Sequence, residues 1–311
     1  MTAPRRPAAP RLLLRAAGRL APRWLFACGH RWRPRATAGA KAPLLLSFDV
    51  DTDGDLSALP VVLDRLRAHG LSASFACVGE WVERRPAEHR RLLAEGHEVL
   101  NHGYAIHNGR DASGALVSTR FYHTLTAAEM DRDIRAGHAA IQRTLGMSPA
   151  GFRAPHFGTL RRRHLGPLYA TLRALGYRYS SSTALGTTGW GVPLVHDGLV
   201  ELPVMGCPDH PTSPFDSWHL WGAPDHPHAP GDLPRLGHRI LADTRTAKGP
   251  TWINVYFDPA MAPATRDFEA FLSLVGAADH IEVLTLGAFA ACWSGGDPAR
   301  AMSGAGGVVS P

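Results

Sequence analysis

Short apolar runs alternate with stretches of helical spacing over most of the chain. The run Leu44–Leu46 is continuous but too short for a helix, so it predicts a buried strand, and Ser74–Val78 and Trp252–Phe257 predict two more. Apolar residues at helical spacing fill the intervals, as at Ser57–His69 and Thr126–Leu145. Strands that alternate with helices in this way predict a parallel sheet, either doubly wound or closed into a barrel.

Two aspartates stand where the first predicted strand ends. Asp49 and Asp51 are two positions apart, so a strand would point both side chains to the same side. Two carboxylates at such a short distance repel each other, and this repulsion costs free energy unless a cation or an arginine balances their charge. The pair therefore favours a metal site or an acid–base site. The alternative interpretation is a simple turn, because the segment Asp51–Asp55 has the composition of turns.

Other polar residues follow other predicted strands. His102 and His107 follow the short strand Glu98–Leu100, Arg153 lies at the end of a later strand, and Asp258 comes after another. In a β/α barrel the strands end at one face, where the loops build the active site. We therefore expect these residues to converge with the two aspartates, although they are far apart in the sequence.

Composition divides the chain into an arm and a body. The 311 residues carry a net charge of +6, but residues 1–42 hold ten basic residues and no acidic one. The remainder is slightly acidic, which argues against a nucleic-acid-binding protein. With 45% hydrophobic residues in the chain, residues 43–295 are expected to form one large domain, and the Gly- and Ala-rich residues 296–311 a flexible tail.

The basic arm permits two interpretations. Arginines recur every four positions from 11 to 23 beside leucines and a tryptophan, so residues 11–26 could form a basic helix on an anionic membrane. The alternative is a disordered leader rich in Arg, Pro and Ala. The same arginines interrupt any apolar segment before Cys28, and no run approaches the ~18 apolar residues of a membrane span. We therefore expect a cytoplasmic protein, at the inner face of the membrane if the arm binds lipid.

Several of these motifs together resemble the polysaccharide deacetylase family, the NodB-homology domain of carbohydrate esterase family 4. Ser47–Asp51 resembles the first motif of the family in its Asp-x-Asp form, and Gly96–Tyr104 resembles its histidine motif. Ser74–Val82 is similar to the strand and helix before that motif, Gly151–His156 to the Arg-x-Pro motif, and Leu284–Leu286 to the closing strand. The resemblance covers nearly the whole body and implies an α/β fold, a distorted (β/α) barrel in a single domain.

The resemblance also implies roles for individual residues. Asp49 would be the general base, while Asp51, His102 and His107 would bind one divalent metal, usually zinc. Arg153 would pair with Asp49 and orient it. A metal of this kind polarises an amide carbonyl and lowers the pKa of a bound water to about 7.

Two aromatic residues are expected to contact a sugar substrate. Tyr104 lies within the histidine motif, and Trp218 lies in the segment 206–234, which is rich in Pro, His and Trp and has no regular period. This segment would supply walls for a sugar ring; the alternative is packing on the outside of the barrel. Cys207 is expected to be a small buried filler, because four cysteines without a CxxC pair predict neither a disulfide framework nor a cysteine zinc site.

Three positions depart from the family pattern. His102 and His107 stand one position farther apart than the family's histidines usually do, so they must lie on an irregular loop rather than on one helical face to share a metal. Asp258 occupies the place of a histidine that acts as general acid, and Ser180 the place of that histidine's acidic partner. An aspartate donates a proton only if its pKa is raised, so Asp258 and His156 are both candidate acids.

These inferences favour a metal-dependent hydrolase that removes an acetyl or formyl group from an amino sugar, on a glycan or a lipid-linked saccharide. The segment Asp49–Thr52 is also similar to deformylases of undecaprenyl-linked aminoarabinose. A second interpretation is a metal-free amidohydrolase of the allantoinase-like branch, if His107 does not reach the metal. A third is a catalytically silent carbohydrate-binding barrel.

Overall fold

The computed structural model describes residues 11–30, 41–112, 114, 116–184, 194–222, 228–229, 231–245, 252–262 and 265–294. Its strands are β1 (Ala42–Val50), β2 (Ser74–Cys77), β3 (Glu98–Asn101), β4 (Asn108–Arg110), β5 (Leu116–Ser118), β6 (Gly151–Phe152), β7 (Tyr179–Ser180), β8 (Leu194–His196), β9 (Leu199–Glu201), β10 (Ile253–Phe257) and β11 (Ile281–Leu284). Its α-helices are α1 (Arg11–Leu20), α2 (Pro22–His30), α3 (Asp53–Ala68), α4 (Gly79–Arg84), α5 (Pro86–Ala94), α6 (Ala127–Leu145), α7 (Arg162–Ala174), α8 (Asp232–Thr244), α9 (Arg266–Gly276) and α10 (Leu286–Ser294).

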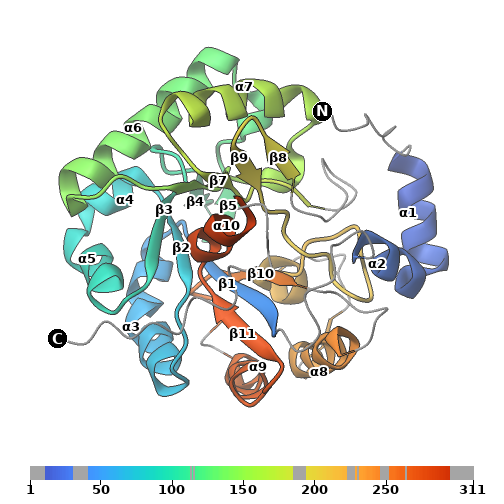
Figure 1. Ribbon diagram of the computed structural model, residues 1–311. Coiled ribbons are helices and arrows are strands. Elements are labelled where there is room, and N and C mark those ends of the chain that lie inside the picture. Colours follow the sequence, from blue (N-terminus) through green and yellow to red (C-terminus); the bar gives the residue numbers. More distant parts are fainter. Residues whose placement is uncertain are drawn as a thin grey trace.

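The main sheet is parallel and strongly curled. Its strands follow the order β10–β1–β2–β3–β6–β7–β9–β8, and β11 pairs with β1. Among its pairs, β8 with β9 is antiparallel and the others are parallel. In Figure 1 the strands surround a centre, and helices α3 to α9 lie outside them. The α/β barrel predicted from the sequence is therefore confirmed.

Strand β1 is buried on both faces, which explains its continuous apolar run. Phe48 points outward, where its ring stacks on Phe75 of β2 with the centroids 5.0 Å apart. Leu45 points into the barrel, in an apolar cluster with residues of α10. Because side chains alternate along a strand, Asp49 and then Asp51 follow Leu45 on the inward face.

Helix α10 closes one end of the barrel. Its Phe289 stacks on Trp252 with the centroids 5.6 Å apart, and Leu286 joins the inward-facing cluster that includes Leu45 and Tyr179. Figure 1 shows α10 lying across the middle of the ring of strands. Since apolar side chains fill this end, the polar side chains of the inward face gather at the other end, where the parallel strands finish.

Asn254 connects β10 to the segment that follows β9. Its buried Nδ2 donates to the carbonyl oxygens of Leu202 and Pro203 over 3.2 and 3.0 Å. The amide of Met205 donates in turn to the carbonyl of Asn254 over 2.8 Å. The barrel is thus joined here by hydrogen bonds of one side chain and a connecting segment rather than by a strand ladder, which accounts for its distorted shape.

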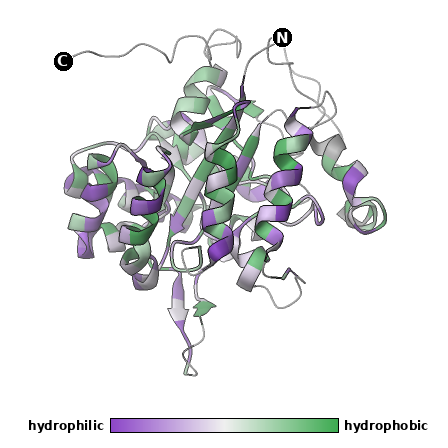
Figure 2. Ribbon diagram, turned by 90° about the horizontal axis from the view of Figure 1, so that it is seen from below, coloured by the Kyte–Doolittle hydropathy of each residue, from purple (hydrophilic) through white to green (hydrophobic). Residues whose placement is uncertain are grey.

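The sequence pattern did not predict the hairpin β4–β5 or the helix α10. The two hairpin strands are short and largely accessible to solvent, so no alternation of polar and apolar positions marks them. Figure 2 shows a small, partly hydrophilic hairpin projecting from one end of the barrel. Helix α10 has an apolar sequence in which small residues, such as the exposed Ala288 and Ala291, take the place of a polar face, so the sequence shows no helical period.

The N-terminal arm contributes two helices beside the barrel, α1 and α2 (Figure 1). Leu25 and Phe26 of α2 are buried, and Phe26 belongs to the main core cluster, so this part of the arm packs on the body. Leu13, Leu20 and Trp24 are exposed. None of the described helices combines the length and the hydropathy that crossing a bilayer requires.

Parts of the predicted domain division lie outside the described residues. These parts are residues 1–10 and 31–40 of the arm and the predicted tail 296–311. The limits drawn at residues 42 and 295 therefore stay predictions.

Candidate active site

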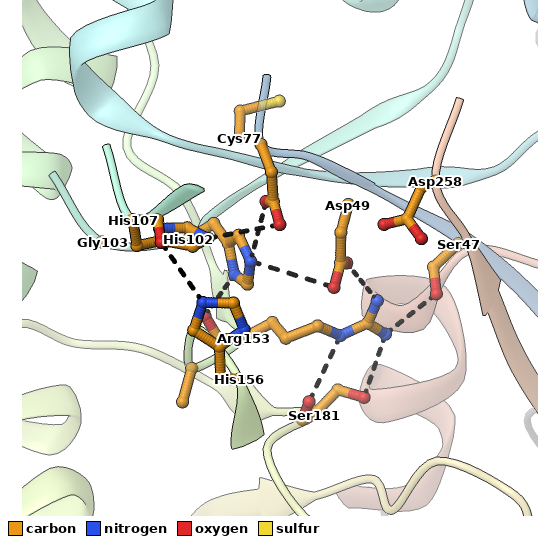
Figure 3. A network of polar contacts seen from close by, with 12 residues as sticks. Ser47, Asp49, Cys77, His102, Gly103, His107, Arg153, His156, Ser181 and Asp258 are labelled. Carbon is orange, nitrogen blue, oxygen red and sulfur yellow. Dashed lines mark hydrogen bonds and ion pairs between the residues drawn. The ribbon is translucent and has the colours of Figure 1, made fainter. Parts of the chain in front are cut away.

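Side chains from three strand ends meet at the open end of the barrel (Figure 3). Asp49 lies in β1 and Asp51 just after it, while His102 follows β3 and Arg153 follows β6. His102 Nε2 lies 3.1 Å from Asp51 Oδ1, and His107 Nε2 lies 3.2 Å from Asp51 Oδ2. The structure thus brings together the three residues expected to bind a metal and places the expected base and arginine beside them.

An irregular loop carries His107 back to His102. The chain turns at Gly103, whose φ of +82° lies in the left-handed region that favours glycine. A Cβ at this position would lie 2.6 Å from Asp133 Oδ2, and Asp133 of α6 accepts hydrogen bonds from the loop backbone. The two imidazole rings end with their centroids 5.0 Å apart. The longer spacing in the sequence therefore still allows both rings to reach Asp51.

Hydrogen bonds to backbone carbonyls determine which ring nitrogens carry protons. His102 Nδ1 lies 2.8 Å from the carbonyl oxygen of Arg153, and His107 Nδ1 lies 3.4 Å from that of Ala105. Because a carbonyl can only accept, each Nδ1 donates and each Nε2 faces Asp51, where a neutral ring offers its lone pair. Asp51 Oδ1 and His107 Nε2 are buried and have no hydrogen-bond partner in the described part of the chain. Two imidazoles and a carboxylate that face one another in this way suit a cation bound between them.

The ligand atoms fit a divalent metal. One carboxylate and two imidazoles form a donor set of catalytic zinc sites, which keep one position open. Ligands at zinc distances of about 2.0–2.2 Å in tetrahedral geometry lie about 3.3 Å from one another. The separations of 3.1 and 3.2 Å from the imidazoles to Asp51 are close to that value. The three residues therefore can hold a metal ion without a change of backbone.

The pKa shifts of Asp51 and His102 favour the charged form of each side chain. Burial alone would raise the pKa of Asp51, but the imidazoles of His107 and His102 hold it well below its ordinary value. Burial alone would lower the pKa of His102, but the carboxylates of Asp51 and Asp49 raise it. The carboxylate of Asp51 thus stays ionised in a buried site that attracts a cation.

Two residues that the sequence analysis did not select hold Asp51 in place. Asn108 Nδ2 donates to Asp51 Oδ2 over 2.8 Å, and Trp81 Nε1 donates to the carbonyl oxygen of Asp51 over 2.8 Å. Asn108 is the last residue of the polar run that contains both histidines. Its position in that run is the feature of the sequence that could have identified it as a site residue. Because Asn108 occupies Oδ2, the buried Oδ1 is left for a metal.

Arg153 fixes the orientation of Asp49. Its Nη1 donates to Asp49 Oδ1 over 2.6 Å, and its Nη2 donates to the hydroxyls of Ser47 and Ser181 over 2.8 and 3.2 Å. Asp49 Oδ2 remains directed toward His102, 3.8 Å from Nε2 (Figure 3). Burial raises the pKa of Asp49, while Arg153 opposes the rise. Asp49 therefore has one oxygen held and one oxygen available to accept a proton beside the metal ligands.

Asp258 lies on the other side of Asp49 (Figure 3). The hydroxyl of Ser217 donates to Asp258 Oδ2 over 2.5 Å and accepts from the amide of Asp258 over 2.7 Å. Burial raises the pKa of Asp258 well above its ordinary value, and the carboxylates of Asp55, Asp51 and Asp49 raise it further. Asp258 is therefore a candidate proton donor, and Ser217 is a partner that the sequence did not reveal.

Asp55 joins the loop after β1 to the loop after β10. Its Oδ2 accepts hydrogen bonds from the amides of Asp51 and Thr52 and from the hydroxyl of Thr52, and its Oδ1 accepts from the amide of Ala260 over 2.9 Å. Burial raises the pKa of Asp55 to about 6, and Asp51 adds to this rise. The segment that could have been a simple turn is thus a capping box of α3 that also positions Asp51.

His156 is held beside His107 with its backbone in the left-handed region, at a φ of 47°. Its Nε2 lies 3.4 Å from the carbonyl oxygen of His107, and its ring packs on Phe121 with the centroids 4.9 Å apart. Burial lowers the pKa of His156 to about 4, so the ring is neutral at neutral pH. Of the two candidate acids, the geometry and the pKa shifts favour Asp258.

The two aromatic residues expected to contact substrate lie in different places. The hydroxyl of Tyr104 donates to Glu83 of α4 over 3.1 Å, so this side chain is held by an outer helix. Trp218 is 42% exposed and directly follows Ser217, the partner of Asp258. Trp218 is thus the better placed of the two for a substrate.

Comparison with known proteins agrees with the geometry. The family model for polysaccharide deacetylases matches residues 37–180. A peptidoglycan-N-acetylglucosamine deacetylase of Bacillus cereus is 41% identical over 69 residues, which are 22% of this chain and 24% of that protein. A chitooligosaccharide deacetylase of Sinorhizobium fredii is 41% identical over 70 residues, 22% of this chain and 31% of that protein. The matched segments thus span less than a third of the length of these relatives.

Solved structures share the fold over most of the chain. One is a protein from Mycobacterium smegmatis whose assignment as a polysaccharide deacetylase is itself provisional, with a TM-score of 0.63, 21% identity, and coverage of 83% of this chain and 92% of that one. Another is the PuuE allantoinase, with a TM-score of 0.63, 12% identity, and coverage of 86% and 95%. At such identities the likeness concerns the barrel and not the chemistry within it.

Proposed function

The chain belongs to the polysaccharide deacetylase family, and we propose that it hydrolyses the N-acyl amide of an amino sugar with a divalent metal held by Asp51, His102 and His107. One observation carries this proposal. Two buried imidazoles direct Nε2 at the buried carboxylate of Asp51, while Asp51 Oδ1 and His107 Nε2 lack a hydrogen-bond partner among the described residues, an arrangement that suits a metal ion. The leaving acyl group would be acetyl or formyl.

Zinc is the metal that the ligands favour. Imidazole nitrogen and carboxylate oxygen suit this borderline-soft ion, and three protein ligands leave one position open. When bound, zinc acts as a Lewis acid and lowers the pKa of water to about 7.

The protein side chains divide the proton transfers between them. Asp49 accepts a proton on Oδ2, because Arg153 occupies Oδ1 and fixes the carboxylate plane. Burial and the neighbouring carboxylates raise the pKa of Asp258 and so favour its protonated form, and Asp258 supplies a proton to the departing sugar amine. Ser217 holds Asp258 at the carboxyl and at the backbone, so the donor keeps one orientation.

An exposed indole supports a sugar as the substrate. Trp218 offers an apolar face on which a pyranose ring can pack, next to the residue that holds Asp258. The substrate would be a glycan or a lipid-linked saccharide that carries an N-acyl amino sugar. The exposed apolar residues of α1 and α2 support contact with a membrane, and we extend the proposal to a protein at the inner face of the membrane.

Hydrolysis of defined substrates tests the proposal. The purified protein, supplied with zinc, is assayed for release of acetate from N-acetylglucosamine oligomers and of formate from N-formyl amino sugars. Asp49→Asn should lower the rate by at least about 100-fold, the contribution typical of general base catalysis, and should keep its metal. Turnover that persists unchanged in Asp49→Asn would refute the assignment of the base. Turnover in wild type without any metal would instead favour a metal-free amidohydrolase, and sugar binding without turnover a silent barrel.

A further inference from the structure

A second cluster of metal-binding side chains lies outside the active site. Cys207, His210 and His228 each direct one ligand atom to a common point, and the three atoms lie within 4.8 Å of one another. The thiol sulfur of Cys207 is 3.6 Å from His228 Nε2 and 3.9 Å from His210 Nδ1. We propose that these three residues bind a second metal ion, a zinc ion by the chemistry of its ligands.

The distances agree with those that a zinc ion imposes. With Zn–S of about 2.3 Å and Zn–N of about 2.0–2.1 Å, sulfur and nitrogen in a tetrahedral site lie about 3.6 Å apart. The sulfur of Cys207 lies at that distance from His228 and only slightly farther from His210. One thiolate and two imidazoles suit zinc better than the hard cations calcium and magnesium.

The surroundings of His228 are those of a metal ligand. Its other ring nitrogen, Nδ1, lies 3.4 Å from Asp232 Oδ2 at the start of α8. Metal-bound histidines commonly donate this second N–H to a carboxylate, which fixes the tautomer and aims the lone pair of the other nitrogen at the metal. The side chain of His228 is only 3% exposed. A row of carboxylate, imidazole and thiol is therefore already in place, with the imidazole and the thiol buried.

Hydrogen bonds hold the turn that carries Cys207 and His210. The amide of Cys207 donates to the carbonyl of Ser213 over 2.9 Å, and the amide of His210 donates to the carbonyl of Cys207 over 3.0 Å. Asp209, between the two ligands, accepts hydrogen bonds from Arg235 over 2.9 Å and from Arg239 of α8 over 2.6 Å. These contacts hold the turn against α8 and so preorganise the ligands, which reduces the cost of binding a metal.

The second metal would connect the ends of the loop that serves the active site. Cys207 and His210 precede Ser217 and Trp218 in the chain, and His228 follows them. A metal at this cluster would therefore hold the turn that carries Cys207 and His210, from which the chain continues to Ser217 and Trp218. This site requires only the cluster itself, so it would stand even if the chain were not a deacetylase.

Cobalt substitution tests the second site by its sulfur. The full-length protein is stripped of metal and titrated with Co²⁺, and absorption is followed in the near ultraviolet, where thiolate-to-cobalt charge transfer occurs. The three expected metal ligands of the active site, Asp51, His102 and His107, contribute oxygen and nitrogen only, so a metal held by them should not produce this band. We expect the band in wild type and in Asp51→Asn, and its loss in Cys207→Ser and His228→Ala. Cys292→Ser, which alters a cysteine on α10, is the matched control and should keep the band.

Metal content gives a second, independent result. Wild type should bind two zinc ions per chain, and the content should fall to one in Cys207→Ser and separately to one in Asp51→Asn. His210→Ala serves as an additional variant if Cys207→Ser does not fold, and should also lower the content to one. Wild type that binds a single zinc and develops no charge-transfer band with cobalt would overturn the proposal. Loss of deacetylase activity in Asp51→Asn with retention of the band would leave it intact.

Discussion

Arg153 holds Asp49 through a hydrogen bond of 2.6 Å from Nη1 to Oδ1, although the two residues come from strands that are not neighbours in the sheet. Both side chains are almost completely buried. Arg153 also donates through Nη2 to Ser47, two positions before Asp49 on β1. The guanidinium thus joins the interior of β1 to β6 and sets the direction of the free oxygen of the proposed base.

Removal of this guanidinium should affect both stability and catalysis. Arg153→Ala leaves Asp49 buried without its partner, and we expect a loss of about 3–5 kcal/mol in the free energy of unfolding. Arg153→Lys keeps the charge but not the fork that reaches Asp49 and Ser47 together, so kcat should fall by about 10–100-fold with a smaller loss of stability. Urea unfolding and steady-state kinetics measure the two effects. Unchanged kcat in Arg153→Lys would mean that the orientation of Asp49 does not limit the reaction.

Asn108 should tune the affinity for metal without touching it. Its amide occupies Asp51 Oδ2, and outer partners of this kind typically contribute 10–100-fold in metal affinity. Asn108→Ala should therefore weaken zinc binding by about that factor, measured by competition with a chelator. Gln142→Ala, which removes an exposed amide on α6, is the control and should bind zinc as wild type does. Equal affinity in both variants would contradict the role of Asn108.

Asp258 should account for the alkaline side of the pH profile. A general acid must be protonated, and burial holds the pKa of Asp258 well above its ordinary value, so activity should fall as pH rises through that pKa. Asp258→Asn should lower kcat for amides and remove this decline, with little effect on an activated ester whose leaving group needs no proton. His156→Ala should keep the alkaline decline. If the decline is lost in His156→Ala and kept in Asp258→Asn, the acid is His156.

Glu201, which takes no part in the proposed proton transfers, should make stability depend on pH. It is buried, and burial raises its pKa from 4.5 to about 6 despite hydrogen bonds from Ser182, Thr183 and Tyr169. The folded state therefore holds the proton more tightly than the unfolded state, and stability should fall as pH rises from about 4.5 to about 6. The change corresponds to ~2 kcal/mol. Urea unfolding at pH 4.5 and pH 7 should reveal this loss in wild type and a smaller one in Glu201→Gln; equal losses would exclude Glu201 as its source.

The arm should bind anionic membranes if its exposed apolar residues enter the interface. Leu20 and Trp24 are 86% and 58% exposed beside Arg19 and Arg23. Co-sedimentation with vesicles that contain anionic lipid should retain wild type, and Leu20→Asp with Trp24→Ala should reduce the bound fraction several-fold. The matched control is Val61→Ala, which changes an exposed apolar residue of α3. Wild type that does not bind would remove the proposed membrane contact.

The sequence predicted the central strand because β1 is buried on both faces and therefore has a continuous apolar run, and it predicted the barrel because such strands alternate with helices. The spacing of Asp49 and Asp51 translated directly into a shared inward face, and the strand ends of β3 and β6 brought His102 and Arg153 to the same place. Local pattern and long-range packing agree at these positions.

The remaining site residues could not be predicted, since they act through contacts that no local pattern encodes. Ser217 meets Asp258 across 41 positions of the sequence, and Asn108 meets Asp51 across 57. The sequence analysis did not predict the cluster of Cys207, His210 and His228 for a related reason. A search for paired cysteines does not detect one cysteine whose partners are histidines from both ends of a long loop.

Zinc content of the active site, measured in the Cys207→Ser background so that the second proposed site does not contribute, tests the central claim most directly. Elemental analysis of Cys207→Ser should give about one zinc per chain, and the additional change His107→Ala should remove it while circular dichroism confirms an unchanged fold. The same metal content with and without His107, or no zinc in Cys207→Ser even after reconstitution, would contradict a metal site formed by Asp51, His102 and His107.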